Sequence, residues 1–218
     1  MLEVGEDRQM QQKSQVVLIE GPVGKLEVRT WGLADPAAVK ALAVICHPHT
    51  LYGGTMDNKV VVTIERALQA LGVATVCLNF RGAGRSEGAY DEGRGEQADL
   101  QAAVAWAKAQ LALSCPLILA GFSFGSYVSL LAHESLKSDF VLAVAPPVSL
   151  YDFSAIEVAC DWMVIQGGAD EVIEAEAVLD WVRQQKQPAD LYWRAEASHF
   201  FHRQLVWLKA VVALGVRV

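Results

Sequence analysis

The sequence lacks any apolar run long enough to cross a membrane. A membrane-spanning helix needs about 20 consecutive apolar residues, and no stretch of the 218-residue chain approaches that length. Residues 1–14 are polar and mixed in charge, so they do not resemble a secretory signal. We therefore expect a cytoplasmic protein with no membrane partner, in which residues 1–14 form a flexible polar leader.

Cysteine is also scarce, and its spacing is uninformative. The chain has 4 cysteines, Cys46, Cys77, Cys115 and Cys160, and none of them forms a CxxC pair or another metal-ligand spacing. Each lies in or beside an apolar, strand-like run. We interpret them as buried, reduced thiols.

Basic residues are outnumbered by acidic ones. With 18 Lys and Arg against 25 Asp and Glu, the formal net charge is -7. Nucleic acids and anionic lipid surfaces are bound mainly through Lys and Arg, so this balance argues against both as partners. The composition is 53% hydrophobic, which is enough to build a core. We assign residues 15–218 to a single domain and leave open whether it is a monomer or a homodimer.

Strand-like and helix-like stretches alternate along most of the chain. Residues 16–20 and 25–30 predict two short strands joined at a Gly-Pro turn, which indicates an N-terminal β-hairpin. Further strands are expected at residues 41–46, 73–80, 117–120, 140–145, 162–166 and 191–194, and helices at about 57–71, 96–111, 124–136, 174–186 and 200–214. This alternation predicts an α/β fold with a mostly parallel, twisted sheet and helices on both faces.

Residues 121–125 read Gly-Phe-Ser-Phe-Gly, a GxSxG sequence between a predicted strand and a predicted helix. In this context a tight turn projects the serine hydroxyl out of the sheet, and the glycines let neighbouring backbones pass closely. Free N–H groups at the start of the following helix face the place where negative charge would develop. The pattern predicts that Ser123 is a nucleophile.

A serine hydroxyl needs a base, and histidine is the side chain best suited to that role. In proteins with this turn, the order along the chain is nucleophile, acid and then histidine, with the histidine after the last strand. Of the 5 histidines, His199 and His202 satisfy that order. We favour His199, at the junction of the last strand and the last helix, over His202, which we place in the first turn of that helix.

The acid is expected in the loop after the penultimate strand, which reads Gly-Gly-Ala-Asp-Glu at residues 167–171. The two glycines permit a sharp reversal that aims Asp170 across the strand ends. Asp170 would accept the second imidazole N–H, fix the tautomer and stabilise the imidazolium. Glu171 remains the alternative acid.

Acyl transfer also needs two donors for the oxyanion, each worth about 2.7–4 kcal/mol of barrier lowering. The backbone N–H of Phe124, directly after the nucleophile, is the first candidate. The loop after residues 41–46 supplies the second, and there Pro48 has no N–H. We favour His49, with Thr50 as the second choice.

Several further motifs accompany the GxSxG sequence. They are His47-Pro48, Gly53-Gly54-Thr55-Met56 with Asn58-Lys59-Val60, Asn79-Phe80-Arg81-Gly82, Gln166-Gly167 through Asp170-Glu171, and Ser198-His199-Phe200-Phe201-His202. With them the chain resembles the α/β-hydrolase superfamily, in particular small lidless bacterial hydrolases loosely related to dienelactone hydrolases. The resemblance covers nearly all of the chain after the leader and implies a triad of Ser123, Asp170 and His199. Dienelactone hydrolases use a cysteine nucleophile where this chain has serine.

The connection between the predicted strands at residues 140–145 and 162–166 is short. A helical lid at this position would need dozens of residues. We therefore expect the α/β-hydrolase fold without a lid domain, and with an open cleft.

Together these observations predict a serine hydrolase that cleaves a small carboxylic ester, thioester or lactone through an acyl-enzyme intermediate. The alternative is a non-catalytic protein that keeps the fold and holds a ligand or a partner in the cleft. No cofactor is expected. A zinc site is not expected among His47, His49, His199 and His202, because one of them is already better explained as the general base.

Overall fold

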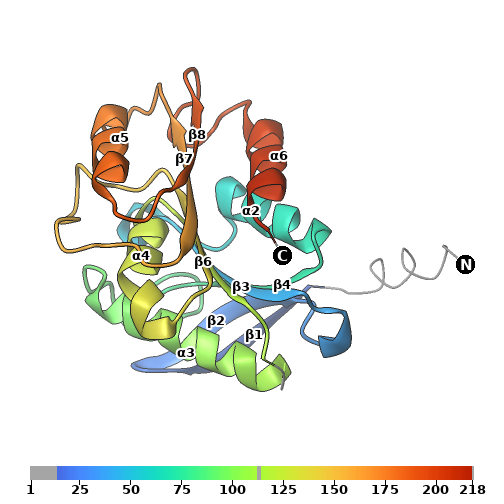
Figure 1. Ribbon diagram of the computed structural model, residues 1–218. Coiled ribbons are helices and arrows are strands. Elements are labelled where there is room, and N and C mark those ends of the chain that lie inside the picture. Colours follow the sequence, from blue (N-terminus) through green and yellow to red (C-terminus); the bar gives the residue numbers. More distant parts are fainter. Residues whose placement is uncertain (1–13, 112–113, 218) are drawn as a thin grey trace, which may run out of the picture.

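The computed structural model describes residues 14–111 and 114–217, so residues 1–13 of the expected leader lie outside it (Figure 1). The described residues form a sheet of 8 strands in the order β1-β2-β4-β3-β5-β6-β7-β8. The strands are β1 Gln15–Gly21, β2 Gly24–Trp31, β3 Ala41–Cys46, β4 Val73–Leu78, β5 Leu117–Phe122, β6 Phe140–Val144, β7 Asp161–Gly167 and β8 Asp190–Arg194. The helices are α2 Lys59–Ala70, α3 Arg94–Leu111, α4 Phe124–Leu136, α5 Ala175–Gln184 and α6 Leu205–Gly215, with short 3-10 turns η1 Pro36–Ala38 and η2 Thr50–Tyr52.

The strand directions confirm the predicted fold class. Strands β1 and β2 form an antiparallel hairpin, and β2 is also antiparallel to β4. Every other neighbouring pair, from β4 across to β8, is parallel. Parallel strands require crossover connections, and here helices that cover the sheet supply them, except between β6 and β7, where the connection has no helix.

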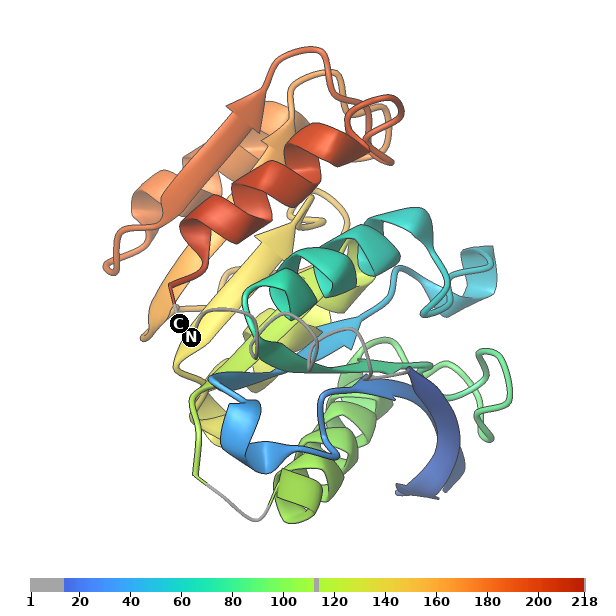
Figure 2. The same ribbon diagram turned by 90° about the vertical axis from the view of Figure 1, so that its right-hand side faces the viewer.

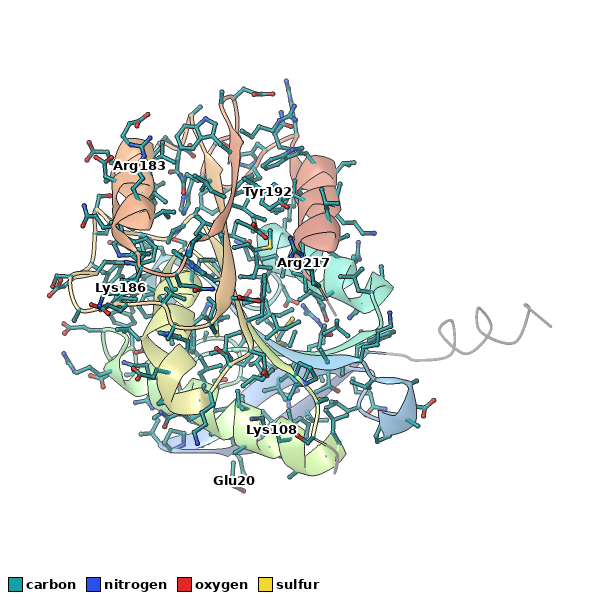
Figure 3. All side chains as sticks on the ribbon, in the orientation of Figure 1. Glu20, Lys108, Arg183, Lys186, Tyr192 and Arg217 are labelled. Atoms are coloured by element: carbon teal, nitrogen blue, oxygen red, sulfur yellow. The ribbon has the colours of Figure 1, made fainter. Side chains whose placement is uncertain are left out.

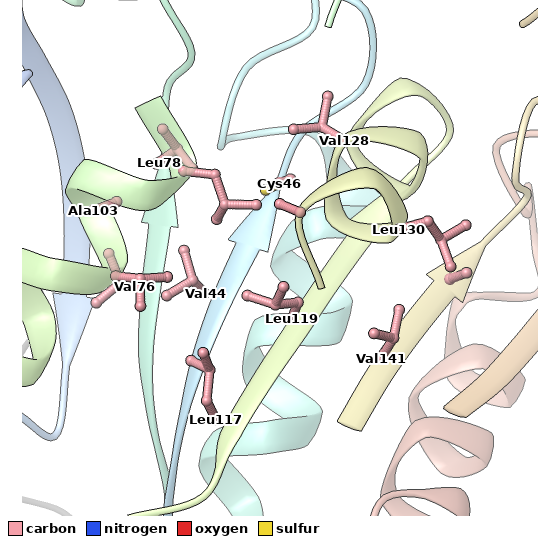
Figure 4. Packing of buried hydrophobic residues seen from close by; sticks show 14 of the residues in the cluster. Val44, Cys46, Val76, Leu78, Ala103, Leu117, Leu119, Val128, Leu130 and Val141 are labelled. Carbon is pink, nitrogen blue, oxygen red and sulfur yellow. The ribbon is translucent and has the colours of Figure 1, made fainter. Parts of the chain in front are cut away.

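Helices cover both faces of the sheet, and the core is divided accordingly. Along β3, Leu42 and Val44 belong to the core layer that includes residues of α3, α4 and α5, whereas Ala43 and Ile45 belong to the layer that includes residues of α2 and α6. Figure 4 shows the first of these layers, with Val44 packed among side chains from the neighbouring strands and from α3 and α4. Figure 2 shows α2 and α6 side by side on the other face. All of β3 is buried, as expected for a strand covered on both sides.

Many charged side chains lie on the outside of the helix layers, although Glu65 on α2 and Glu96 and Asp99 on α3 are buried. Lys108 on α3, Arg183 on α5 and Lys186 just after α5 are exposed and extend from the surface in Figure 3. The interface between the helices and the sheet is built from the apolar side chains of the two core layers. Side chains that could take part in a reaction are therefore expected in the loops at the ends of the strands.

Two loops decide the shape of the cleft. Residues 145–160, between β6 and β7, are all described and contain turns but no helix, so no lid is inserted there. Helix α6 begins at Leu205, and residues 200–204 form turns instead of the predicted first helical turn. Phe201 has φ 51° and Arg203 has φ 61°, values that a right-handed helix does not allow. His202 therefore precedes the helix, and its predicted placement within the helix was wrong.

Within residues 14–111 and 114–217, no helix combines the length and the apolar composition that crossing a membrane requires.

Candidate active site

Ser123 lies in a tight turn between β5 and α4. Its backbone has φ 52° and ψ -121°, a conformation that costs a residue with a side chain about 1–3 kcal/mol. The turn is held because the Ser123 N–H donates to Val144 O at 2.8 Å, while Ser126 N and Ser126 Oγ donate to Ser123 O at 2.8 and 2.6 Å. This strained turn presents the hydroxyl at the carboxyl end of the strand.

The two glycines of the GxSxG sequence are required by close backbone packing. A Cβ atom on Gly121 would lie 2.2 Å from the backbone of Gly125, and a Cβ atom on Gly125 would lie 2.3 Å from Cys46 O. Neither position has room for a side chain. The first turn of α4 therefore packs closely against the end of β3 at Cys46 and His47.

The structure brings Ser123, His199 and Asp170 together from three different loops. His199 Nε2 lies 3.1 Å from Ser123 Oγ, and His199 Nδ1 lies 2.8 Å from Asp170 Oδ2. The side chains of His199 and Asp170 are 3% and 0% exposed. Because Nδ1–H donates to the carboxylate, Nε2 carries the lone pair that accepts the serine hydroxyl proton.

Asp170 is surrounded by donors. Its Oδ1 accepts the N–H groups of Val172 at 2.9 Å and Ile173 at 2.8 Å, and its Oδ2 also accepts from Gln166 Nε2 at 3.2 Å. Burial acts to raise the pKa of Asp170, but the hydrogen bonds from His199, Ile173 and Val172 outweigh it, and the pKa lies below its ordinary value. The carboxyl group is therefore ionised at neutral pH. Gln166 falls within a motif of the family resemblance, but no role was predicted for it; its contact with Asp170 is found in the structure.

The two rejected alternatives occupy different positions. Glu171 Oε2 accepts the backbone N–H of His199 at 3.0 Å, so it supports the histidine loop and not the imidazole. His202 is exposed, and its N–H donates to Ser198 Oγ at 3.3 Å. Asp170 and not Glu171 contacts the imidazole, and His199 and not His202 contacts the serine hydroxyl.

The loop after β3 folds tightly over the serine. His49 has φ -54° and caps η2, since its Nδ1 accepts the N–H of Leu51 at 3.2 Å. A Cβ atom on Gly54 would lie 2.1 Å from Pro48 O, so this glycine is needed for the loop to close. The His49 and Phe124 rings are 5.2 Å apart, and both residues line the cavity that contains Ser123. Thr50 lies next to His49, and among the described residues its buried Oγ1 has no hydrogen-bond partner.

The buried side chain of His47 holds this loop through two hydrogen bonds. It is fully buried, its Nδ1 donates to Pro48 O at 2.5 Å, and its Nε2 accepts the N–H of Phe80 at 3.0 Å. Only a neutral imidazole can make both bonds. Burial lowers the pKa of His47 to about 4, in agreement with that tautomer.

A cavity of about 620 Å³ lies over Ser123 at the carboxyl ends of the strands. It is formed by the loops after β3, β5, β6, β7 and β8. Its described lining residues are Pro48, His49, Tyr52, Gly53, Gly54, Asn58, Ser123, Phe124, Pro147, Leu150, Tyr151, Val172, His199 and Phe200. None of them is Asp, Glu, Lys or Arg. In the part of the chain that the structure describes, no three His, Cys, Asp or Glu side chains are grouped as metal ligands would be.

Known structures share this architecture closely. The protein is similar to an α/β serine hydrolase without a lid from Xanthomonas campestris, with a TM-score of 0.88, 43% identity and 94% of each chain covered. It is also similar to an α/β serine hydrolase homologue from Coxiella burnetii, with a TM-score of 0.87 and 40% identity over 93% of this chain and 97% of that one. A curated relative, an uncharacterized protein of Rickettsia prowazekii, is 34% identical over 171 residues, which are 76% of this chain and 71% of the relative.

The family comparison agrees with the fold. Residues 9–160 match the sequence pattern of the X-Pro dipeptidyl-peptidase (S15) family. The match extends from the N-terminal hairpin through the serine turn to the end of the β6–β7 connection. With the lidless α/β architecture and its solved relatives, it identifies a hydrolase: the chain belongs to the X-Pro dipeptidyl-peptidase (S15) family, within the α/β-hydrolase superfamily.

Proposed function

We propose that the protein is a serine esterase that cleaves a small carboxylic ester, thioester or lactone through an acyl-enzyme intermediate. The observation that carries the proposal is the continuous hydrogen-bonded series from Ser123 Oγ through His199 to Asp170. This arrangement makes an ordinary hydroxyl nucleophilic, because the base is within bonding distance and is itself held by a carboxylate. Ser123, His199 and Asp170 are the proposed catalytic residues.

In the acylation step, Ser123 Oγ attacks the carbonyl carbon and its proton moves to His199 Nε2. The carbonyl π bond opens and its electron pair becomes the oxyanion, while Asp170 stabilises the imidazolium. The oxyanion then re-forms the carbonyl, the bond to the leaving oxygen or sulfur breaks, and His199 returns the proton to the leaving group.

Deacylation repeats these steps with water. His199 Nε2 takes a proton from water as the water oxygen attacks the acyl carbon. The bond to Ser123 Oγ then breaks and the serine regains its proton from His199. The carboxylic acid leaves, and the enzyme returns to its starting state.

The proposed oxyanion donors are the backbone N–H groups of Phe124 and His49. Phe124 is the first residue of α4, and the N–H groups of a helix's first turn have no partner within the helix. His49 approaches from the loop that Gly125 and Gly54 allow to close. Both donors face charge that develops only during the reaction, so they lower the barrier without tightening binding of the substrate.

The family description raises peptide cleavage as a competing activity. An X-Pro dipeptide carries an ammonium group at its N-terminus. Such a group needs a carboxylate partner when binding removes its hydration shell. None of the described residues that line the cavity is acidic. The cavity therefore favours an uncharged ester over an X-Pro dipeptide. The other alternative, a binding protein without activity, gives no reason for a strained serine hydrogen-bonded to an imidazole.

The test is steady-state hydrolysis of p-nitrophenyl acetate by the wild-type protein and by Ser123→Ala. We expect the variant to lose at least about 10⁴-fold in kcat, because removing the nucleophile of a triad removes the whole pathway. Circular dichroism provides the folding control. Retained turnover in Ser123→Ala, no hydrolysis of any ester by the wild type, or more efficient cleavage of Ala-Pro-p-nitroanilide than of the ester would contradict the proposal.

A further inference from the structure

Exposed apolar side chains gather around the proposed catalytic serine. Tyr52 is 87% exposed, Leu150 58%, Val172 45% and Phe200 40%, and all four line the cavity over Ser123. They come from four different loops, after β3, β6, β7 and β8. Single exposed apolar residues are normal on a protein surface, but a cluster that converges on one cavity marks a binding site for an apolar group.

The same cavity is free of charge. None of its described lining residues is Asp, Glu, Lys or Arg, and the titratable groups in the lining are histidines and tyrosines. Burial lowers the pKa of His49 and raises the pKa of Tyr151, which keeps both neutral at pH 7. A carboxylate or ammonium on the substrate would lose its water here without gaining a partner, and that is costly.

The proposed chemistry assigns the cavity walls to different parts of an ester. The carbonyl oxygen must face the N–H groups of Phe124 and His49. The leaving group must lie near His199 Nε2, because that atom protonates it. Of the remaining walls, which also include Tyr52 and Val172, the β6–β7 loop contributes both Leu150 and Tyr151.

In this wall the Tyr151 ring is packed against other aromatic side chains. The Tyr151 ring is stacked on Tyr127 with centroids 4.7 Å apart, and it also contacts Phe124 at 5.7 Å. A preformed aromatic surface binds an apolar chain without a further ordering cost.

We infer that the acyl part of the substrate is an uncharged, apolar chain that packs against Leu150 and Tyr151. The inference rests on the proposed esterase function and adds to it the chemical class of the substrate. The cavity of about 620 Å³ has the size of a small-molecule site, so it accommodates a chain well beyond acetyl.

The experiment compares kcat/KM of the wild-type protein for three p-nitrophenyl esters: the acetate, the hexanoate and the half-ester of adipate. Hexanoate and adipate have the same chain length and differ by a terminal carboxylate. Each methylene that becomes buried favours the reaction by about fourfold. We expect kcat/KM for the hexanoate to be at least 10-fold higher than for the acetate. It should also be at least 10-fold higher than for the adipate half-ester.

Two lysine variants locate the acyl chain. Leu150→Lys places an ammonium group at the proposed wall, so the hexanoate-to-adipate ratio should fall by at least 10-fold. Val206→Lys is the matched control, because Val206 is 85% exposed on α6 and is not part of the cavity. That variant should keep the wild-type ratio.

The outcomes separate this inference from the proposed function. Equal or preferred use of the adipate half-ester by the wild type would overturn the inference, and so would a ratio that Leu150→Lys leaves as unchanged as Val206→Lys does. In either case, Ser123-dependent hydrolysis of the acetate would leave the esterase proposal standing. No hydrolysis of any of the three esters would instead overturn the esterase proposal itself.

Discussion

A cavity lies at each end of the parallel strands, and the two cavities differ in character. The one at the carboxyl ends has a volume of about 620 Å³ and is lined by apolar and aromatic side chains around Ser123 and His199. The one at the amino ends has about 380 Å³ and is lined in part by Asp139, Asp161 and Arg217. The second cavity is rich in charge, but its described lining residues include no nucleophile paired with a base.

The difference follows from the direction of the chain. Each parallel strand enters a loop at its carboxyl end, and all but β6 then enter a helix. Side chains from separate loops and the N–H groups of a helix start therefore meet at that edge. Ser123, Asp170 and His199 follow β5, β7 and β8 in this way. At the amino ends Asp139, Asp161 and Asp190 are exposed, so their charges interact in a high dielectric. The carboxyl ends of the strands, which we call the reactive edge, are therefore distinguished by polar groups that meet inside an apolar cavity. The amount of charge does not distinguish them.

The largest expected difference between the two edges concerns two aspartates at opposite ends of β7. Asp170→Asn should lower kcat for p-nitrophenyl acetate by about 10⁴-fold, because an amide cannot hold the reactive imidazole tautomer. Asp161→Asn, at the amino end, should stay within about twofold of the wild type, as expected for a surface change far from the site. Similar losses in both variants, or a small loss in Asp170→Asn, would remove the distinction between the edges.

The second prediction sharpens the description of the reactive edge by testing its backbone donors. His49 has φ -54°, close to the value of about -65° that proline imposes, so His49→Pro removes the N–H with little backbone strain. We expect kcat to fall about 10²–10³-fold below that of His49→Ala, which keeps the N–H and controls for the lost ring. Thr50→Pro should leave kcat near that of Thr50→Val. If Thr50→Pro is the damaging change, Thr50 and not His49 is the donor.

The third prediction concerns stability at the reactive edge. His47 is neutral in the folded protein with a pKa of about 4, below its ordinary value of 6.5. Between these pH values the unfolded chain binds more protons than the native state, so the free energy of unfolding falls as the pH falls. The stability is complete above pH 6.5 and declines down to pH 4, by up to about 3 kcal/mol at 1.36 kcal/mol per pKa unit.

Urea unfolding of the wild type and of His47→Gln across that pH range measures this contribution. The glutamine preserves an acceptor for the Phe80 N–H but does not titrate. Its stability should therefore fall less than that of the wild type over the same range. Parallel curves for the two proteins would show that His47 is not the source of the slope.

The smallest expected effect compares backbone strain at the two edges. Ser123 has φ 52° and ψ -121°, whereas Lys137, at the end of α4, has φ 50° and ψ 54° in the common left-handed region. Glycine adopts the Ser123 conformation without strain, so Ser123→Gly should be about 1 kcal/mol more stable than Ser123→Ala. Lys137→Gly should gain less relative to Lys137→Ala. Equal gains at both positions, measured by urea unfolding, would mean that the serine turn stores no special strain.

Much of the fold follows from local patterns in the sequence. The apolar run of β3 and the GxSxG turn have the positions that periodicity and glycine spacing predict. The start of α6 was missed because positive φ values at Phe201 and Arg203 break the helix, and no propensity indicates them at such bulky residues. Arg81 pairs with the buried Asp99, and Glu96 accepts the N–H groups of Asp91 and Gly93 just before α3, contacts that no local pattern indicates.

Site residues could be predicted where the chemistry allows few residue types. They could not be predicted where a residue's role depends on tertiary contacts between loops. A nucleophile, a base and an acid have few candidates, so Ser123, His199 and Asp170 were selected by order along the chain. Gln166 and Glu171 act through single contacts, one with the carboxylate of Asp170 and one with the backbone of His199. Such contacts depend on how two loops meet, which no local pattern encodes.

The central claim is that Ser123 is an activated nucleophile, and stoichiometric labelling tests it most directly. The folded wild-type protein is treated with a fluorophosphonate probe, and the adduct is located by peptide mass mapping. The account predicts one equivalent of label, confined to Ser123, with labelling slowed strongly in Asp170→Asn and unaffected in Asp161→Asn. Absence of label on Ser123 in the folded protein, or label on another serine at the same rate, would contradict it.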